Sequence, residues 1–437
     1  KGLSPFGRRR HSSLSSSLDA TPAGRVSGGF VSFCNFFPVW FCMSIPDKPR
    51  LYSFEFASLC VLIFLAYCNI SVFYSLYVYF EALGVPQSWR GFLIGSSSLA
   101  TMAVYLTVSP FLTTQNAAKA AAAGVVVLLG CGAAYLYAVT PGALLAVRLA
   151  NGLGVALVSA GAMTLLVAAI PPSRSGQAFG VYSIAMLLPY SVVPPIFDWL
   201  SPSHMDYPHG YALVAMALAP ALIVLAVLGR QVKKRRAPQV QRPTLAAMAR
   251  NASKGPVAQL LAVNAMYYLS FASIYFLAKS LFVARGLAGA GIFFSIQTGC
   301  MLLLRLFANR VFDVAPKLWL IRFCYAVTGG TFLLLFAAHS QGMAYLAAVL
   351  LGCGMGVGSP SLNAYMYELS EPAFRGLNAN LMMLSLQGGS FLGPILGGAA
   401  VAAWGYDGFL LVGAGACLVG LVMSAGLGRA ASGASAS

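Results

Sequence analysis

Apolar and polar positions follow one another along the chain in blocks, with apolar runs of about 20 residues separated by short polar intervals. A run of that length crosses the hydrocarbon core of a bilayer as a helix, because a helix pairs its own backbone polar groups. Membrane strands would instead alternate apolar and polar positions over about ten residues, which these runs do not. Twelve runs meet the helical criterion, near residues 54–80, 91–112, 119–139, 142–170, 178–199, 211–229, 257–283, 289–311, 317–338, 343–368, 376–403 and 408–428.

The composition supports this pattern and excludes a soluble protein. Of the 437 residues, 59% are hydrophobic and 8% are charged, and a soluble chain of this length needs far more charge to cover its surface. The net charge of +17 raises the alternative of nucleic-acid binding, but the basic residues gather in the gaps between apolar runs instead of interleaving with aromatics. We therefore expect an all-α polytopic protein of the lipid bilayer that binds no nucleic acid.

Charge also orients the expected helices, because positively charged loops stay on the cytoplasmic side. With both termini cytoplasmic, 22 of the 27 Lys and Arg residues fall in cytoplasmic segments, and only Arg90 and Arg285 fall in outer loops. The remaining three, Arg148, Lys279 and Arg305, lie within spans. This bias predicts a multi-pass protein with both termini in the cytoplasm.

The first 42 residues differ from the rest of the chain. The stretch "RRRHSSLSSSLDATPAGRVSGG" has a composition typical of disorder, and "FVSFCNFFPVWFCM" is too short to span a bilayer. A basic start before a short apolar run also resembles a signal peptide, which a polytopic protein with a cytoplasmic N-terminus does not need. We expect residues 1–42 to be a disordered or misassigned extension and Met43 to be the natural start.

The longest polar interval, "GRQVKKRRAPQVQRPTLAAMARNASKGP", divides the spans six plus six. The two halves align without gaps at an offset of 200 residues, and this register pairs Gly91 with Gly291, Gly152 with Gly352, Gly154 with Gly354, and Pro194 with Pro394. We expect an internal duplication, with bundles at 43–229 and 257–428, a basic cytoplasmic linker at 230–256 and a tail at 429–437. Repeats of this kind place the substrate site at their interface, near the midplane.

A charged stretch at the end of the eighth span, "RLFANRVFD" (305–313), resembles a loop of the major facilitator superfamily. In that family the loop between the second and third helices of each half carries Gly-x-x-x-Asp-Arg-x-Gly and two basic residues. Asp313 and Lys317 keep the acidic and basic positions, Asn309 replaces the glycine, and in the first half only Lys119 survives. The resemblance implies a cytoplasmic gate of Asn309, Arg310, Asp313 and Lys317, in which the acid latches helix ends. Anchoring at the lipid interface is the alternative.

Two further stretches add to the resemblance. "RLANGLG" (148–154) matches the family's fourth-helix pattern Arg-x-x-x-Gly-x-Gly. "GSFLGPILGG" (389–398) matches the antiporter-associated pattern of the fifth helix, yet it lies in the eleventh, and the fifth has "PYSVVPPIFD" (189–198). The resemblance covers about residues 43–428 and implies twelve helices in two pseudo-symmetric six-helix bundles, the major facilitator fold, without indicating a subfamily.

Polar side chains inside the spans are the candidates for solute binding, since a charge or amide in lipid is costly unless it faces protein or water. By resemblance Arg148 would face a central cavity and either bind an anionic group or modulate a proton carrier, and snorkelling to the outer surface is the alternative. Amide and phenol groups in apolar walls suit a partly polar small molecule, whereas a single Tyr is also common in packing. The candidates are Tyr67, Asn69, Tyr74, Arg148, Asn151, Asn264, Tyr267, Tyr268, Gln297 and Asn363.

Proton coupling would need a titratable group, and no acid lies in the middle of an expected span. Glu55 and Glu368 lie near cytoplasmic ends, and Glu81 and Asp198 lie near outer ends. Proton antiport could use one of these four acids, and facilitated diffusion fits as well.

Cofactor and metal chemistry are not indicated. The nine Cys are scattered without a CxxC motif, and His204, Asp206 and His209 could hold a metal only weakly in an outer loop. "GCGMGVG" (352–358) lacks the Lys of a phosphate loop, so its glycines favour close helix packing. We expect no metal and no cofactor.

These observations favour a secondary transporter that moves a small organic solute by alternating access, as a monomer in a bacterial-type inner (plasma) membrane. Proton-driven export of a drug or metabolite is the direction that the resemblance favours. Uptake or facilitated diffusion of a metabolite, and a non-transporting receptor or scaffold of the same fold, stay as alternatives. An intramembrane enzyme would need His or an acid pair inside the spans, and the sequence offers neither.

Overall fold

The computed structural model describes residues 53–108, 111–169, 175–200, 206–232, 250–251, 253–307, 315–371 and 374–434. The expected N-terminal extension (1–42) and most of the expected linker (233–249) lie outside these ranges. Within them the chain is helical and contains no strand, as the length of the apolar runs predicts.

The first six spans comprise α1 (Phe54–Ser71), η1 (Val72–Ser75), α2 (Leu76–Ala82), α3 (Gln87–Thr107), α4 (Thr114–Tyr135), α5 (Pro141–Ala169), α6 (Ser175–Leu200), α7 (Tyr207–Met216) and α8 (Ala221–Val232). The second six are α10 (Gly255–Ala284), α11 (Ala290–Phe307), α13 (Lys317–Ala337), α14 (Gln341–Leu369), α15 (Arg375–Trp404) and α16 (Tyr406–Ala434). The first span is interrupted by the 3-10 segment η1, and the sixth is broken between α7 and α8.

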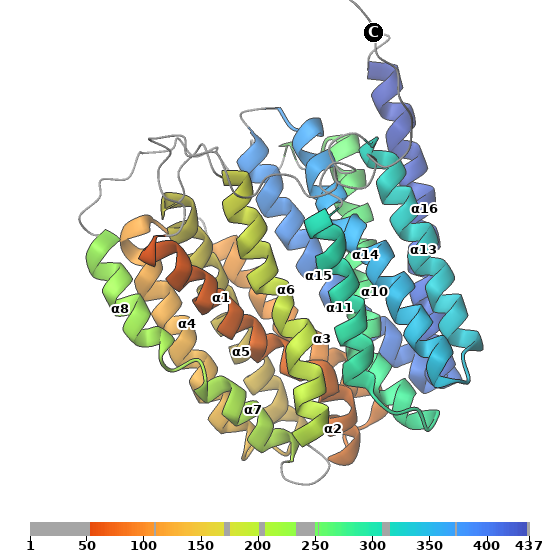
Figure 1. Cartoon of the computed structure of the whole chain (residues 1–437), viewed down its shortest axis with the longest axis horizontal. Coiled ribbons are helices and arrows are strands. Elements are labelled where there is room, and N and C mark those ends of the chain that lie inside the picture. Colours follow the sequence, from red (N-terminus) through yellow and green to blue (C-terminus); the bar gives the residue numbers. More distant parts are fainter. Residues whose placement is uncertain are drawn as a thin grey trace, which may run out of the picture. The chain divides into compact units, whose positions relative to one another are not determined.

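Consecutive helices alternate in direction, which places five short connections (83–86, 136–140, 285–289, 338–340 and 405) at one end of the bundles, the short-turn end. The glycines with positive φ, Gly84, Gly286, Gly289 and Gly405, all lie there, where the chain needs a conformation that other residues adopt at a cost. The opposite end, which carries the starts of α1 and α10 and the end of α8, is the linker end. It lies at the top of Figure 1.

Among the described residues, eleven helical segments are long and apolar enough to cross a membrane, with α1–η1–α2 and α7–α8 each forming one span. The twelfth expected span corresponds to α3, which has 21 residues but does not reach the same hydropathy. Helix α3 packs against α15 on one side and α5 on another. Because protein covers these faces, α3 accommodates polar side chains such as Thr101, which donates to the carbonyl of Gly152 at 3.0 Å.

Close glycine contacts recur in the two halves at the same offset of 200 residues. A Cβ on Gly152 in α5 would lie 2.0 Å from the carbonyl oxygen of Ser97 in α3. A Cβ on Gly352 in α14 would lie 2.3 Å from the carbonyl oxygen of Gln297 in α11. Only glycine allows these helices to approach so closely. The two six-helix bundles are therefore built alike, and they have the pseudo-symmetry that the sequence predicts.

The bundles meet along two equivalent interfaces, α3 with α15 and α6 with α11 (Figure 1). A Cβ on Gly91 in α3 would lie 2.1 Å from the carbonyl oxygen of Pro394 in α15. In the other interface, a Cβ on Gly291 in α11 would lie 2.6 Å from the nitrogen of Pro195 and 2.7 Å from the carbonyl carbon of Pro194 in α6. Each interface thus sets a glycine against a proline-containing turn of the opposite bundle.

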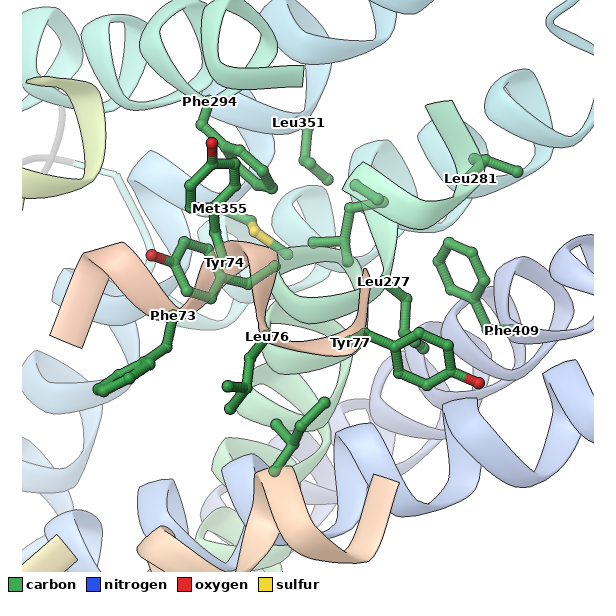
Figure 2. Close-up of a cluster of buried hydrophobic side chains, with 14 of the residues drawn as sticks. Phe73, Tyr74, Leu76, Tyr77, Leu277, Leu281, Phe294, Leu351, Met355 and Phe409 are labelled. Carbon is green, nitrogen blue, oxygen red and sulfur yellow. The ribbon is translucent and has the colours of Figure 1, made fainter. Parts of the chain in front are cut away.

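The 3-10 segment in the first span places its side chains in the core between the bundles. All four residues of η1 are buried, and Figure 2 shows Tyr74 beside Phe294 of α11. Their ring centroids lie 5.9 Å apart in an edge-to-face contact. The same hydrophobic cluster contains Leu277, Leu281, Leu351, Met355 and Phe409. The first span of one bundle therefore packs directly into the second bundle.

Candidate functional site

Helix α6 contains prolines near its short-turn end, and they expose backbone groups to the second bundle. Pro195 has no N–H, so the carbonyl of Ser191 lacks its usual helical partner. The hydroxyl of Ser295 in α11 donates to that carbonyl at 2.6 Å, and the Ser191 hydroxyl donates to the Ser295 carbonyl at 3.3 Å. At the equivalent position of the other interface, Gly95 packs against the carbonyl of Phe391. One interface therefore has polar contacts where the other has glycine packing.

Asp198, in the last turn of α6, joins four helical segments. Its Oδ1 accepts hydrogen bonds from Lys279 Nζ of α10 at 2.7 Å and from the Tyr74 hydroxyl of η1. Its Oδ2 accepts the backbone N–H of Gly291 at 2.6 Å. Gly291 is the second residue of α11, where free N–H groups and the helix dipole favour a negative charge. The carboxylate therefore binds an ammonium, a phenol and a helix N-terminus at once.

The ammonium of Lys279 is enclosed by aromatic rings. Lys279 is 7% exposed, and Nζ also donates to the Tyr74 hydroxyl at 3.1 Å. Nζ lies 4.7 Å from the ring centroid of Tyr74, 5.3 Å from that of Tyr207 and 5.9 Å from that of Phe197. The Asp198 side chain is 25% exposed, so solvent screens the ion pair only in part. Removal of either partner would leave a poorly solvated charge.

A continuous path of aromatic rings leads from this ion pair toward the middle of the spans. Tyr74 contacts Phe294 at 5.9 Å between ring centroids, Phe294 contacts Tyr275 at 5.2 Å, Tyr275 contacts Tyr190 at 5.1 Å, and Tyr190 contacts Tyr67 at 6.2 Å. The rings belong to η1, α11, α10, α6 and α1, so they come from both bundles. The path ends at the half-buried Tyr67.

The predicted polar residues of α5 form contacts inside the first bundle. The Asn151 amide donates to the side-chain oxygen of Asn69 at 3.2 Å, and both are buried. Arg148 is 2% exposed, and its guanidinium donates to the carbonyl of Ile94 at 2.7 Å and to the Ser97 hydroxyl at 2.5 Å. Its Nη1 is buried without a hydrogen-bond partner. Arg148 therefore lies between α5 and α3 instead of reaching the outer surface.

Two predicted amides are enclosed in the second bundle. Asn264 donates to the Ser385 hydroxyl at 2.6 Å, and Gln297 donates to the sulfur of Met355 at 3.6 Å. Both residues are 2% exposed or less, and the side-chain oxygen of each has no hydrogen-bond partner. Each amide nitrogen therefore contacts a residue of its own bundle.

The predicted tyrosines of α10 contact α14. The Tyr267 hydroxyl donates to the carbonyl of Met355 at 2.8 Å, and the Tyr268 hydroxyl lies 3.2 Å from that of Ser359. Tyr267 is buried, whereas Tyr268 and Ser359 are half-buried. Asn363, one turn along α14, is exposed. The structure thus brings Tyr267 and Tyr268 together with α14, at a different place from Asn69 and Asn151 of the first bundle.

The four predicted coupling acids divide between the two ends. Asp198 forms the ion pair above, and Glu81, also at the short-turn end, accepts the Tyr406 hydroxyl at 3.0 Å and lies 3.4 Å from Arg90. Glu55 lies in the first turn of α1 and Glu368 near the end of α14, both at the linker end.

Of the predicted gate, Lys317 is the first residue of α13. Asn309, Arg310 and Asp313 lie outside the described residues.

Sequence reasoning placed Lys279 in a span without selecting it as a site residue. The available signal was a lysine well inside an apolar run, with Asp198 at the corresponding end of another run. The backbone N–H of Gly291 has no sequence signature at all. Only the packing of α6 against α11 and α10 brings these groups together.

Comparison with known structures supports the fold. A bacterial homologue of the human lysosomal transporter Spinster, in an inward-facing and unoccupied conformation, matches with a TM-score of 0.67 and 14% identity, over 87% of this chain and 97% of that one. A mutant of the nucleoside transporter NupG matches with a TM-score of 0.65 and 16% identity, over 85% and 99%. A POT family transporter in complex with a thioalcohol-conjugated peptide matches with a TM-score of 0.67 and 13% identity, over 84% and 94%.

Sequence comparison supplies the family. No curated protein matches the chain. A sequence model of the Major Facilitator Superfamily matches residues 59–287 and 257–432, which together cover most of the chain and both bundles. The protein therefore belongs to the Major Facilitator Superfamily.

Proposed function

We propose that the protein moves a small organic solute across the bilayer by alternating access, and that Asp198, Lys279 and Tyr74 close the path at the short-turn end. The observation that carries this proposal is the placement of contacts between the bundles. The hydrogen bonds, ion pair and ring contacts that join described residues of the two bundles lie from mid-span to the short-turn end. Rocking of one bundle against the other would break this set of contacts as a unit.

The groups between the bundles suit a partly polar solute. The aromatic path brings ring faces and phenol hydroxyls from both bundles to mid-span, near the half-buried Tyr67, Tyr190 and Tyr268. Aromatic walls with a few hydroxyls are typical of small-molecule sites. We also propose that the protein works as a monomer, uses no cofactor and catalyses no reaction.

Proton-driven export is the direction we propose. The charge bias supports a cytoplasmic linker end in a bacterial-type inner membrane, because 22 of the 27 basic residues lie in segments on that side and two in outer loops. In this orientation the contacts between the bundles close the outer side, which is the state in which an exporter loads its solute. Asp198 is the acid that we propose couples export to protons, because its carboxylate binds Lys279 of the other bundle.

The experiment compares metabolites inside cells and in the medium, for cells that express the wild-type protein or Asp198→Asn at matched membrane levels. Each culture is measured with and without a proton uncoupler. Glu371→Gln is the matched control, because Glu371 also pairs with a lysine, Lys254 at 2.6 Å, but both are exposed and lie outside the interface between the bundles.

Export predicts a solute that leaves wild-type and Glu371→Gln cells, leaves Asp198→Asn cells more slowly, and stops leaving with the uncoupler. Accumulation of a solute inside the cells would show that the protein takes up its solute instead of exporting it. Equal metabolite profiles in cells with the protein and cells with an empty vector would contradict transport itself.

A further inference from the structure

Arg305 differs from Arg148 and Lys279, the other two basic residues that the sequence placed well within the spans. Lys279 pairs with Asp198, and Arg148 donates to backbone and hydroxyl oxygens between α5 and α3. Arg305 of α11 takes part in none of the ion pairs between described residues. Its Nε is buried and has no hydrogen-bond partner.

The charge of Arg305 lies toward mid-span. Arg305 is two residues from the last residue of α11 at the linker end, where an arginine ordinarily extends its charge to interfacial water. The Cα–Cβ bonds of a helix tilt toward its N-terminus, which directs the Arg305 side chain back along α11 toward Met301, one turn earlier. Met301 packs on α14, where a Cβ on Gly356 would lie 3.1 Å from its Cα, and a Cβ on the nearby Gly358 would lie 2.5 Å from the ring of Tyr267. Tyr267 is twelve residues from the start of α10 at that end, or about 18 Å along the helix. A charge placed at such depth is costly and marks a functional site.

Packing places the same segment of α11 beside the polar groups of α14. A Cβ on Gly356 would lie 3.2 Å from a methyl carbon of Leu304, the neighbour of Arg305. One turn along α14, the Ser359 hydroxyl lies 3.2 Å from that of Tyr268. Arg305, Ser359 and Tyr268 are all half-buried. The second bundle therefore gathers a guanidinium and two hydroxyls near mid-span.

The first bundle presents aromatic rings to this group. Tyr190 of α6 contacts Phe271 of α10, one turn from Tyr268, at 6.1 Å between ring centroids, and it contacts Tyr67 of α1 at 6.2 Å. Tyr67 and Tyr190 are half-buried, like Tyr268. The second bundle thus presents Arg305 and Tyr268 on one side of the interface, and the first bundle presents the rings of Tyr67 and Tyr190 on the other.

We propose that the solute is a small organic monoanion with an aromatic body, whose carboxylate or sulfonate pairs with Arg305. The hydroxyls of Tyr268 and Ser359 are further donors, and the rings of Tyr67 and Tyr190 pack on the aromatic body. A guanidinium matches a planar carboxylate with two parallel hydrogen bonds. A single unpaired positive charge neutralises one negative charge, so the site disfavours dianions and repels cations. This inference rests on the proposed transport function.

The test measures the thermal unfolding of the purified protein with aromatic probes of matched size and different charge, since a ligand that binds the folded state raises the unfolding temperature. The anions are benzoate, phenylacetate and benzenesulfonate, and the comparison compounds are benzamide, benzylamine and phenyl phosphate. The anions are expected to bind at least about tenfold more tightly than benzamide, because a hydrogen bond to a charged group contributes that much. Arg305→Gln is expected to abolish this preference and leave the benzamide response unchanged.

Two further variants separate charge from folding. Arg305→Lys keeps the charge without the planar fork, so it should retain part of the preference for anions even if Arg305→Gln unfolds. Arg375→Gln is the matched control, because Arg375 stacks on Tyr367 near the linker end, outside the proposed site, and this variant should bind the anions like the wild type.

The inference is overturned if no anion of the panel binds better than benzamide, or if Arg305→Gln and Arg305→Lys keep the full preference. Its failure is distinguishable from that of the proposed function. Movement of a neutral or cationic solute in the metabolite experiment would support the transport function and contradict the anion site. Binding of the anions as expected, without movement of any solute, would support the anion site and contradict the transport function.

Discussion

Replacement of Lys279 by Met tests the closure of the short-turn end. Methionine retains the length and apolar stem of the lysine and removes its charge. Asp198 therefore loses its 2.7 Å partner, while the space between the surrounding aromatic rings stays filled. The side chain of Asp198 then keeps the Tyr74 hydroxyl and the Gly291 N–H as its remaining donors. The carboxylate is left partly buried without a compensating charge.

The size of the effect follows from the burial of the pair. Breaking a buried pair costs about 3–5 kcal/mol, and the 25% exposure of Asp198 lets water recover part of this, which leaves roughly 2–3 kcal/mol. Only the state closed at the short-turn end contains the pair, because its partners belong to different bundles. The equilibrium between the closed and open states should therefore shift by roughly 30- to 150-fold toward the open state.

The assay is amide hydrogen exchange of the protein in lipid nanodiscs, read on peptides that cover residues 190–200 and 290–297. Lys279→Met is expected to accelerate exchange there, since opening separates α6 from α11. Lys254→Met is the matched control: Lys254 pairs with Glu371 at 2.6 Å, but the pair is exposed and lies within the second bundle. This control should leave exchange in both peptides unchanged, because exposed pairs contribute little.

A double variant completes the test. Asp198→Asn combined with Lys279→Met removes both charges and should return exchange toward the wild-type rate, because no charge is left uncompensated. The reasoning is refuted if Lys279→Met leaves exchange of α6 and α11 unchanged in a folded protein. It is refuted equally if the double variant exchanges faster than either single variant.

Three further predictions concern packing and topology. Gly91→Ala should lower the unfolding temperature strongly, because its Cβ would lie 2.1 Å from the carbonyl oxygen of Pro394, whereas Gly130→Ala, with no atom within 4 Å of its Cβ, should be neutral or stabilising. Arg148→Met should destabilise the protein by about 2–4 kcal/mol, since it leaves the Ser97 hydroxyl and neighbouring carbonyls without their charged donor, and a denaturant titration measures this loss. A fluorescent protein fused to the C-terminus should fluoresce, as it does only in the cytoplasm; a dark fusion at normal abundance would reverse the proposed orientation.

Much of the fold could be predicted from the sequence because its causes are local or periodic. Run length determined the helices, and the glycine register at an offset of 200 residues indicated the duplication that the paired contacts of Gly152 and Gly352 display. The break in the sixth span also had a signal, since Pro220 precedes the first residue of α8 and cannot donate to the preceding turn. The 3-10 segment at 72–75 had none, because it contains neither Gly nor Pro.

The candidate site could be predicted less well, because its contacts join distant parts of the chain. Arg148 could be identified as a charge inside a span, but its partners are largely backbone carbonyls of α3, which every sequence provides. Lys279 and Asp198 are 81 residues apart, and their pairing depends on how α6 packs against α10 and α11. The role of Gly291 depends on its place at a helix start. Residue type indicated which groups were unusual, and packing decided which of them meet.

The most direct measurement of the central claim is solute flux through a protein whose bundles are covalently cross-linked between mid-span and the short-turn end. Ser191 and Ser295 exchange hydrogen bonds with each other's backbone, so cysteines at both positions are close enough for a disulfide. The double variant, with the native cysteines replaced, is reconstituted in vesicles, and flux of the solute identified in the metabolite experiment is measured after oxidation and again after reduction. Alternating access predicts that oxidation stops the flux, that reduction restores it, and that each single-cysteine variant is insensitive to both. Undiminished flux through the fully cross-linked protein would contradict the account.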